Sequence, residues 1–326
     1  MPKPRILVLS LGGTITMVPS ETGGIAPRLG AAELVASVPG LADVADIDAR
    51  SLFRLPSPSL STTDLVDVAR VIGEGFDTGF DGAVVIQGTD TIEESAFLLD
   101  LLVDSEKPVV VTGAMRGADA PGADGPANLL SAVIVAASPA SHGLGTLAVL
   151  NYDIHAARFV QKSHTALPSA FLSPLVGTIG TLIERRPRYY VRIPRTPCLA
   201  VAEGPPAPVA LIKVAMGDDG RMLSMLPGLG YAGVVLEGMG AGHVPADVAP
   251  LVGELAAKVP VVLASRVMSG EVFTNTYGYP GAEIDLIKRG VVPAGYLSGL
   301  KARLLLGLVR RGRGAASVAK AFAPYQ

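Results

Sequence analysis

The chain has 326 residues, 49% of them hydrophobic, with 27 basic and 29 acidic side chains. This length predicts about two domains with a sizeable core, and the balanced charge excludes the basic footprint of a nucleic-acid-binding protein. One cysteine, Cys198, excludes an internal disulfide, and the four histidines form no zinc-binding motif.

The N-terminal segment predicts neither secretion nor membrane insertion. Its apolar run from Ile6 to Leu11 is too short for the core of a signal peptide. No stretch of about 20 apolar residues follows, so no membrane span is expected. We therefore expect a cytoplasmic protein without a membrane partner.

Seven short runs rich in β-branched residues predict strands. Several are apolar on both faces, as expected for strands buried in a parallel sheet. In chain order the runs are Arg5–Leu11, Gly82–Gly88, Pro108–Gly113, Thr146–Asn151, Val209–Ala215, Gly233–Gly238 and Pro260–Ser265.

Five segments with helical periodicity lie between or after these runs. Ser61 begins one of them, and Thr91, followed three residues later by Glu94, fits a capping box at the start of another. The segments are Ser61–Gly75, Thr91–Asp104, Gly125–Ala137, Pro245–Lys258 and Ser298–Arg311.

The alternation of strands and helices predicts an α/β fold with an open, mostly parallel sheet. The stretch from Glu184 to Pro208 is rich in proline and arginine, and few helices or strands tolerate that composition. We therefore predict a large N-terminal catalytic domain of residues 1–190, a linker of residues 191–208 and a smaller α/β C-terminal domain of residues 209–326.

Polar residues follow the first two predicted strands, where ligands of open α/β sheets bind. Gly12-Gly13-Thr14 ends the first strand, and Thr89-Asp90-Thr91 ends the second. Singly, these residues suit a turn and a helix start, but together they place two hydroxyls and a carboxylate at one sheet edge. No third glycine after Thr14 opens a helix, and no G-x-x-x-x-G-K-[ST] occurs, which argues against a nucleotide.

A threonine hydroxyl is a weak nucleophile and needs a base. Lysine, tyrosine and a carboxylate are the candidates, since no metal site is expected. Lys162 is the only lysine between Lys107 and Lys213, and its sequence surroundings alone indicate a surface lysine.

Several motifs, taken in order, resemble the bacterial-type L-asparaginase/glutaminase family. They read LGGTI at 11–15, QGTDTIEE at 87–94, TGAMR at 112–116 with ADGPANL at 123–129, IHAAR at 154–158 before Lys162, ASRV at 264–267 and GAEID at 281–285. The resemblance covers nearly the whole chain. Each motif is modest alone, but the ordered set is specific.

The resemblance implies an amidohydrolase without metal or cofactor that converts L-asparagine and water to L-aspartate and ammonia. Thr14 would attack the side-chain amide, and water would then hydrolyse the acyl-enzyme. Thr89, Lys162 and Asp90 would form the second catalytic group.

The resemblance also implies how the substrate, a small amino-acid amide, is bound. Asp90 would hold its α-ammonium together with Glu283 of an adjacent subunit, and Ser57 would bind its α-carboxylate. The backbone around Gly88, Thr89 and Ala114 would stabilise the developing oxyanion. The implied assembly is a homotetramer built as a dimer of dimers.

Three departures from the family concern the surroundings of this site. The lid at residues 16–28 has no tyrosine, so Glu21, its only carboxylate, is a candidate base. Pro58 stands where many relatives carry a polar side chain. His243 lies in a stretch that is usually rich in asparagine, and we interpret it as packing or filling an interface.

These departures leave alternatives to hydrolysis of L-asparagine. One is a glutaminase or another small-amide hydrolase, including one for a D-amino-acid amide. Another is a non-catalytic amino-acid-binding relative. The amidase component of an archaeal-type tRNA amidotransferase would need an extra N-terminal domain, whereas this chain begins at its first strand. The presence of Thr14, Thr89, Lys162 and Asp90 favours an enzyme.

Overall fold

The computed structural model describes residues 2–13, 15, 17–19, 25–27, 30–200, 207–311 and 316–326. The chain forms two compact units, Met1–Leu199 and Ala200–Gln326. The boundary between them falls inside the predicted linker, and the domain limits at residues 190 and 209 stay a prediction.

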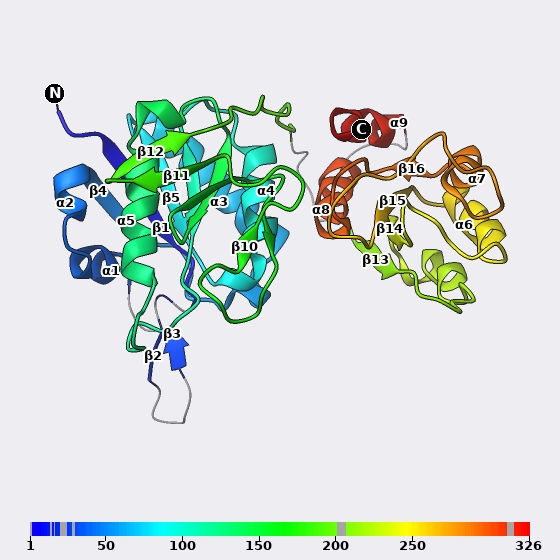
Figure 1. Ribbon diagram of the computed structural model, residues 1–326, viewed down its shortest axis with the longest axis horizontal. Helices are drawn as coiled ribbons and strands as arrows, with labels where there is room; N and C mark the ends of the chain where they lie inside the picture. The colour runs from blue at the N-terminus through cyan, green and yellow to red at the C-terminus, as the bar shows by residue number, and fades with distance from the viewer. Residues whose placement is uncertain are drawn as a thin grey trace. The chain divides into compact units, whose positions relative to one another are not determined.

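The first unit is built on an eight-stranded sheet with the strand order β12-β11-β8-β7-β6-β5-β1-β4 (Figure 1). Five neighbouring strands are parallel: β4 (Asp46–Ser51), β1 (Arg5–Ser10), β5 (Gly82–Ile86), β6 (Val109–Thr112) and β7 (Thr146–Leu150). The sheet continues antiparallel with β8 (Asp153–Ala156), β11 (Gly180–Ile183) and β12 (Arg186–Tyr189).

Helices cover both faces of this sheet, which is why its central strands are apolar on both sides. Every residue of β5, β6 and β7 is buried. Helix α5 (Gly125–Ala136) packs on β5, β6 and β7, while α3 (Thr62–Asp77) and α4 (Ile92–Leu102) lie side by side on the other face (Figure 1).

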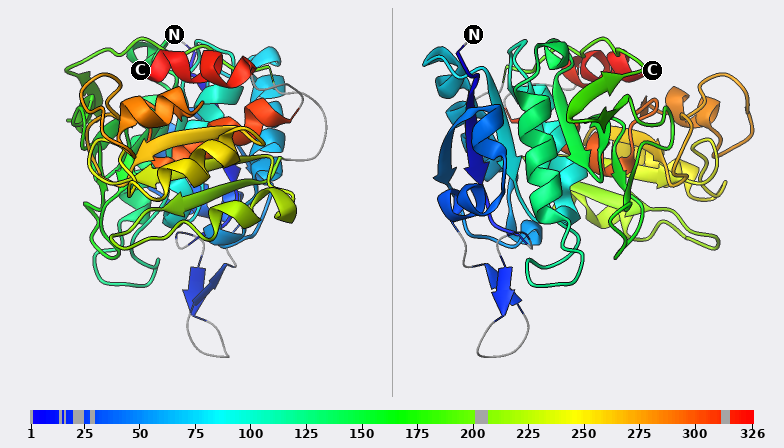
Figure 2. Two further views of the ribbon diagram at one scale, coloured as in Figure 1. Left: turned by 90° about the vertical axis from the view of Figure 1, so that its right-hand side faces the viewer. Right: turned by 60° about the vertical axis from the view of Figure 1, so that its left-hand side comes forward.

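Smaller elements surround the sheet of the first unit. Strands β2 and β3 form a hairpin that projects from the unit (Figure 2). Strands β9 and β10 form an antiparallel pair outside the large sheet. The bounds are α1 Ala31–Ser37, α2 Leu41–Val44, β2 Met17–Pro19, β3 Ile25–Pro27, β9 Gln161–Lys162, β10 Phe171–Leu172, η2 Ser57–Ser59, η3 Thr89–Thr91 and η4 Pro139–Ser141.

The second unit has a four-stranded parallel sheet: β13 (Val209–Lys213), β14 (Gly233–Gly238), β15 (Val261–Ser265) and β16 (Val292–Pro293). Helix α8 (Gly299–Arg310) covers one face, and α6 (Ala249–Ala256) and α7 (Glu283–Lys288) help to bury the other. The remaining elements are η5 Leu223–Met225, η6 Pro227–Leu229, α9 Ala316–Phe322 and η7 Ala323–Tyr325. None of the helices described in either unit is long and apolar enough to cross a membrane.

The predicted two-domain α/β fold is confirmed, and so are the seven predicted strands and five helices, with ends shifted by a few residues. One local prediction is wrong. The Thr91 side chain does not cap α4, because its hydroxyl donates to the Ser57 carbonyl. The stretch from Glu184 to Pro208, where few strands were expected, contains the short strand β12 at Arg186–Tyr189, since an edge strand tolerates a proline such as Pro187.

The ends of β1 and β5 meet closely enough that only glycine fits there. A methyl group on Gly13, whose φ is +94°, would lie 2.1 Å from the backbone nitrogen of Gly88. Gly13→Ala should therefore lower the free energy of unfolding by about 1–3 kcal/mol, as overpacking does, which urea denaturation will measure.

Gly73→Ala in α3 is the matched control, because a methyl group there meets nothing within 4 Å. It should be neutral or stabilise the chain by up to about 1 kcal/mol. Equal stability of the two variants would contradict the tight contact at Gly13.

Candidate active site

The carboxyl ends of three neighbouring strands bring the predicted site residues to one edge. Ser10 of β1 pairs with Ile86 of β5, and Ile86 pairs with Thr112 of β6, so the chain leaves all three strands at the same level. The turns that follow are therefore adjacent, as expected for parallel strands.

Thr14 and Glu21 lie outside the described residues, but both chain neighbours of Thr14 are described. Gly13 packs on the backbone of Gly88. Ile15 is 4% exposed, and its side chain lies where a methyl group on Gly125 would be, next to Ala114. The first motif is thus anchored on either side of Thr14 against the turns after β5 and β6.

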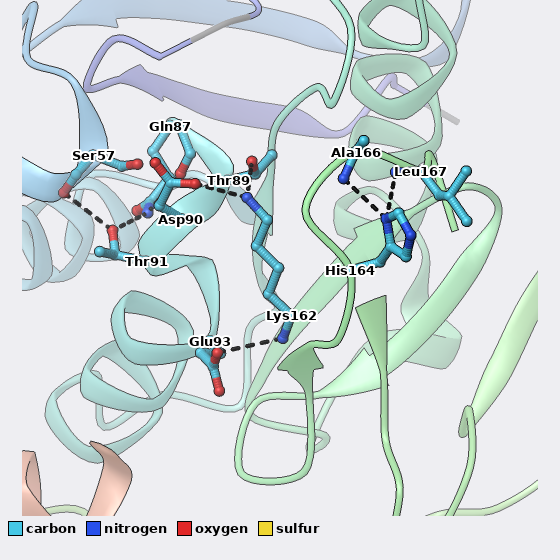
Figure 3. A network of polar contacts seen from close by, with 11 residues as sticks. Ser57, Gln87, Thr89, Asp90, Thr91, Glu93, Lys162, His164, Ala166 and Leu167 are labelled. Atoms are coloured by element: carbon cyan, nitrogen blue, oxygen red, sulfur yellow. Dashed lines mark hydrogen bonds and ion pairs between the residues drawn. The ribbon is translucent and has the colours of Figure 1, made fainter. Parts of the chain in front are cut away.

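The ammonium group of Lys162 donates hydrogen bonds to two residues of the motif at 87–94 (Figure 3). Its Nζ donates to Thr89 Oγ1 at 2.9 Å and to Asp90 Oδ1 at 2.7 Å. The Lys162 side chain is 15% exposed, so the interpretation of a surface lysine is wrong. The contact spans 72 residues of sequence between Lys162 and Asp90.

This arrangement is poorly explained by stability alone. The Asp90 side chain is 60% exposed, and ion pairs open to solvent contribute only about 0–1 kcal/mol. Thr89, by contrast, is 6% exposed. A buried hydroxyl that accepts from a lysine can exchange protons with it, which is the chemistry needed to activate a hydroxyl or a water.

Strand β4, which the sequence did not predict, delivers Ser57 to the same edge. Beyond β4, the Leu55 amide donates to the Leu11 carbonyl at 3.0 Å. Ser57 is 2% exposed, and its Oγ would lie 2.6 Å from a methyl group on Gly88, so glycine is required at residue 88. Pro58 follows within η2 and is exposed.

Two residues that were not predicted to belong to the site, Gln87 and Thr91, hold this loop in place. Thr91 Oγ1 accepts from Gln87 Nε2 at 3.1 Å and donates to the Ser57 carbonyl at 3.3 Å. Both belong to the motif at 87–94, so their place in the motif is the signal that could have found them.

Asp124 and Asn128 hold the turn that contains Ala114. The Met115 and Arg116 amides donate to Asp124 at 3.0 and 2.9 Å, and Asn128 Nδ2 donates to the Gly113 carbonyl at 2.9 Å. Ala114 itself is 1% exposed. These contacts fix its backbone beside the end of β5.

A cavity of about 450 Å³ opens next to the Lys162–Asp90 pair and is also lined by Ser163, His164 and Thr165. This volume suits a small ligand. The His164 Nδ1 accepts from the amides of Ala166 and Leu167 (Figure 3). In the neutral imidazole, the proton is therefore on Nε2, which makes that nitrogen a donor.

Glu283 belongs to the second unit, and its side chain is wholly buried. Oε1 accepts from the amides of Thr276 and Tyr277 at 2.8 and 2.6 Å, while Oε2 contacts His243 Nε2 at 3.2 Å. Within one chain Glu283 thus faces His243, and its assignment as an ammonium ligand stays a prediction.

His243 links this carboxylate to a phenol. The Tyr279 hydroxyl lies 2.9 Å from His243 Nδ1, and the imidazole also meets the Tyr277 ring edge-on. Burial raises the pKa of Glu283, but the hydrogen bonds from backbone amides and the nearby His243 outweigh it, so the pKa falls below its usual 4.5.

The structure therefore brings together Ser57, Gly88, Thr89, Asp90, Ala114 and Lys162 in the first unit, whereas Glu283 belongs to the second. Among the described residues, no group of three or more His, Cys, Asp and Glu side chains is placed to hold a metal ion.

Two family models match the chain: Asparaginase, N-terminal, over residues 5–195, and Glutaminase/Asparaginase C-terminal domain, over residues 208–322. An L-asparaginase from Bacillus licheniformis is 34% identical over 94% of this chain and 95% of its own length. A component of the glutamyl-tRNA(Gln) amidotransferase from Methanosarcina barkeri is 30% identical over 89% of this chain and 70% of its own length.

A solved structure gives the same match in three dimensions. The crystal structure of a probable cytoplasmic L-asparaginase from Campylobacter jejuni is similar with a TM-score of 0.87 and 30% identity. The similarity covers 99% of this chain and 100% of that chain.

The lowered pKa of Glu283 predicts a pH-dependent stability. An ionised carboxylate with a depressed pKa stabilises the fold above its unfolded-state pKa, and this contribution is lost as the pH falls through the folded-state value. The advantage of the wild type over Glu283→Gln in urea unfolding should therefore shrink as the pH drops below 4.5.

Glu254→Gln, which changes an exposed glutamate on α6, serves as the control and should show no such trend. If the stability difference between the wild type and Glu283→Gln stays constant from neutral to acidic pH, the lowered pKa of Glu283 is contradicted.

Proposed function

The chain belongs to the bacterial-type L-asparaginase family, and we propose that it hydrolyses L-asparagine to L-aspartate and ammonia through a threonine acyl-enzyme. The observation that supports this most strongly is the pair of hydrogen bonds from Lys162 Nζ to Thr89 and Asp90 at the carboxyl edge of the sheet. These bonds support the assignment of Lys162 as the group that exchanges protons beside the first motif.

In the first displacement, Thr14 Oγ attacks the carbon of the side-chain amide, and ammonia leaves with the proton lost by the hydroxyl. Gly13 and Ile15, which flank Thr14, contact the turns that carry Gly88 and Ala114. Thr89 is the first residue of η3, and η3 runs directly into α4. Amides at such a helix start, with that of Ala114, would stabilise the oxyanion.

In the second displacement, water attacks the acyl ester and L-aspartate leaves. The Thr89 hydroxyl accepts from Lys162 in the structure. Once Lys162 has given up a proton to solvent, its amine would accept one from this hydroxyl, which in turn would take a proton from the attacking water. As the ester bond to Thr14 breaks, Lys162 would return that proton to the Thr14 oxygen. Asp90 holds the ammonium form of Lys162 in place.

Recognition of an amino acid requires groups for both of its charges. The Asp90 carboxylate is exposed and lines the cavity beside Lys162, so it would bind the α-ammonium by a charge-assisted contact. Ser57 at the same edge would bind the α-carboxylate. A contribution from Glu283 of an adjacent subunit would require its contact with His243 to open.

We also propose a homotetramer, a dimer of dimers, in the cytoplasm. In support of an assembly, each unit exposes large apolar side chains that contacts between subunits would cover; Met216 is 93% exposed. Others in the second unit are Met222, Met225, Leu229, Val267 and Met268. The similar protein from Campylobacter jejuni is described as probably cytoplasmic.

A glutaminase or another small-amide hydrolase is the second candidate. Pro58, which follows Ser57, has no side-chain donor for a ligand, so a polar contact that many relatives could make at this position is missing. Ammonia release from L-asparagine, D-asparagine, L-glutamine and simple amides separates these activities.

The role of Lys162 gives a direct test of the function. Lys162→Met should lower kcat for ammonia release from L-asparagine by about 100- to 10,000-fold, the usual contribution of acid–base catalysis. Steady-state ammonia assays will measure it.

Lys107→Met is the matched control, because Lys107 Nζ also donates two hydrogen bonds in the first unit, to the Phe76 and Phe80 carbonyls. It should lower thermal stability but leave kcat of the folded enzyme near wild type. If Lys162→Met retains wild-type kcat, the catalytic assignment fails.

A further inference from the structure

The strand that carries Lys162 has little support of its own. Strand β9 contains only Gln161 and Lys162, and it pairs with the two residues of β10 outside the eight-stranded sheet. Isolated two-stranded pairs are at best marginally stable. Lys162 therefore needs further contacts to keep its ammonium at a fixed place.

Glu93 supplies such a contact to the backbone of Lys162, at the opposite end of the residue from its ammonium group. Glu93 Oε1 lies 3.3 Å from the backbone amide of Lys162, from which it accepts a hydrogen bond. Figure 3 draws this contact as a dashed line. Glu93 lies on α4 four residues after Thr89, so one continuous helical segment contacts both the backbone and the Nζ of Lys162.

The burial of Glu93 indicates that its hydrogen bonds, including the one from the Lys162 amide, matter to the structure. The residue is 8% exposed, and burying a carboxylate is costly unless it is hydrogen-bonded. A second carboxylate on α4, Asp100, is 6% exposed and accepts from the amide of Thr146 at the start of β7 at 2.8 Å. Helix α4 thus contacts β9 and β7 in the same way, through a buried carboxylate that accepts from a strand amide. Of these two strands, β9 is the one that carries a candidate site residue.

We propose that Glu93 is a positioning residue for Lys162, an inference that rests on the proposed function of that lysine. By holding the amide of Lys162, it fixes where the side chain leaves β9 and hence how Nζ meets Thr89. Displacing a catalytic group by 1 Å can cost about 100-fold in rate, so a contact without any role in the chemistry itself can control turnover.

Two substitutions separate the hydrogen bond from other effects. Glu93→Gln keeps an oxygen that accepts from the Lys162 amide, whereas Glu93→Met has similar length and no strong acceptor. We expect Glu93→Met to lower kcat for L-asparagine by about 100-fold with little change in KM. Glu93→Gln should stay within about threefold of wild type, since the acceptor is retained.

Asp100→Asn and Asp100→Leu are the matched controls on the same helix. Asp100→Leu should lower the thermal midpoint, Asp100→Asn should lower it less because it retains an acceptor, and both folded enzymes should keep their kcat. A Glu93→Met enzyme with wild-type kcat would overturn the proposal, and so would a Glu93→Gln enzyme as slow as Glu93→Met.

Hydrogen exchange tests the positioning independently of turnover. In Glu93→Met the amide of Lys162 should exchange about tenfold faster, as expected for one lost hydrogen bond, and in Glu93→Gln it should remain protected. Unchanged exchange in both would overturn the proposal. If the wild type has no amidase activity but the two variants show these exchange rates, the proposed function is contradicted and the Glu93 contact still stands.

Discussion

The interaction between Lys162 and the Thr89-Asp90 pair is the one on which the proposed chemistry depends. Lys162 comes from a two-residue strand outside the main sheet, whereas Thr89 and Asp90 begin the helical segment after β5. An exposed partner makes the ion pair a weak source of stability. Its geometry instead gives a buried hydroxyl a neighbour that can take and return a proton.

Close backbone packing lets the other groups converge on the same edge. Glycines at 13 and 88 allow the turn after β1, the turn after β5 and the Ser57 loop to touch, because a methyl group at either glycine would overlap its neighbours. Asp124 and Asn128 fix the turn after β6. The site is thus formed mainly by main chain, with a few side chains projecting from it.

Much of the fold could be predicted because its central strands are uniformly apolar and its helices are periodic. Strand β4, Asp46–Ser51, was missed because an edge strand with partly exposed residues reads DIDARS, without an apolar run. That strand carries the chain to Ser57. The contacts of Lys162 could not be predicted from its neighbours in sequence, because its partners are 72 and 73 residues away; only the family resemblance indicated that it belongs with Thr89 and Asp90.

The central claim is that a covalent ester forms at residue 14 and that the Lys162 group serves its hydrolysis. Acid quenching of Lys162→Met during reaction with L-asparagine, followed by digestion and peptide mass mapping, tests this most directly. We predict an aspartyl group on the peptide containing Thr14, absent when Thr14 is also changed to alanine. An aspartyl group on the peptide containing Thr89, or turnover without any adduct, would contradict the account.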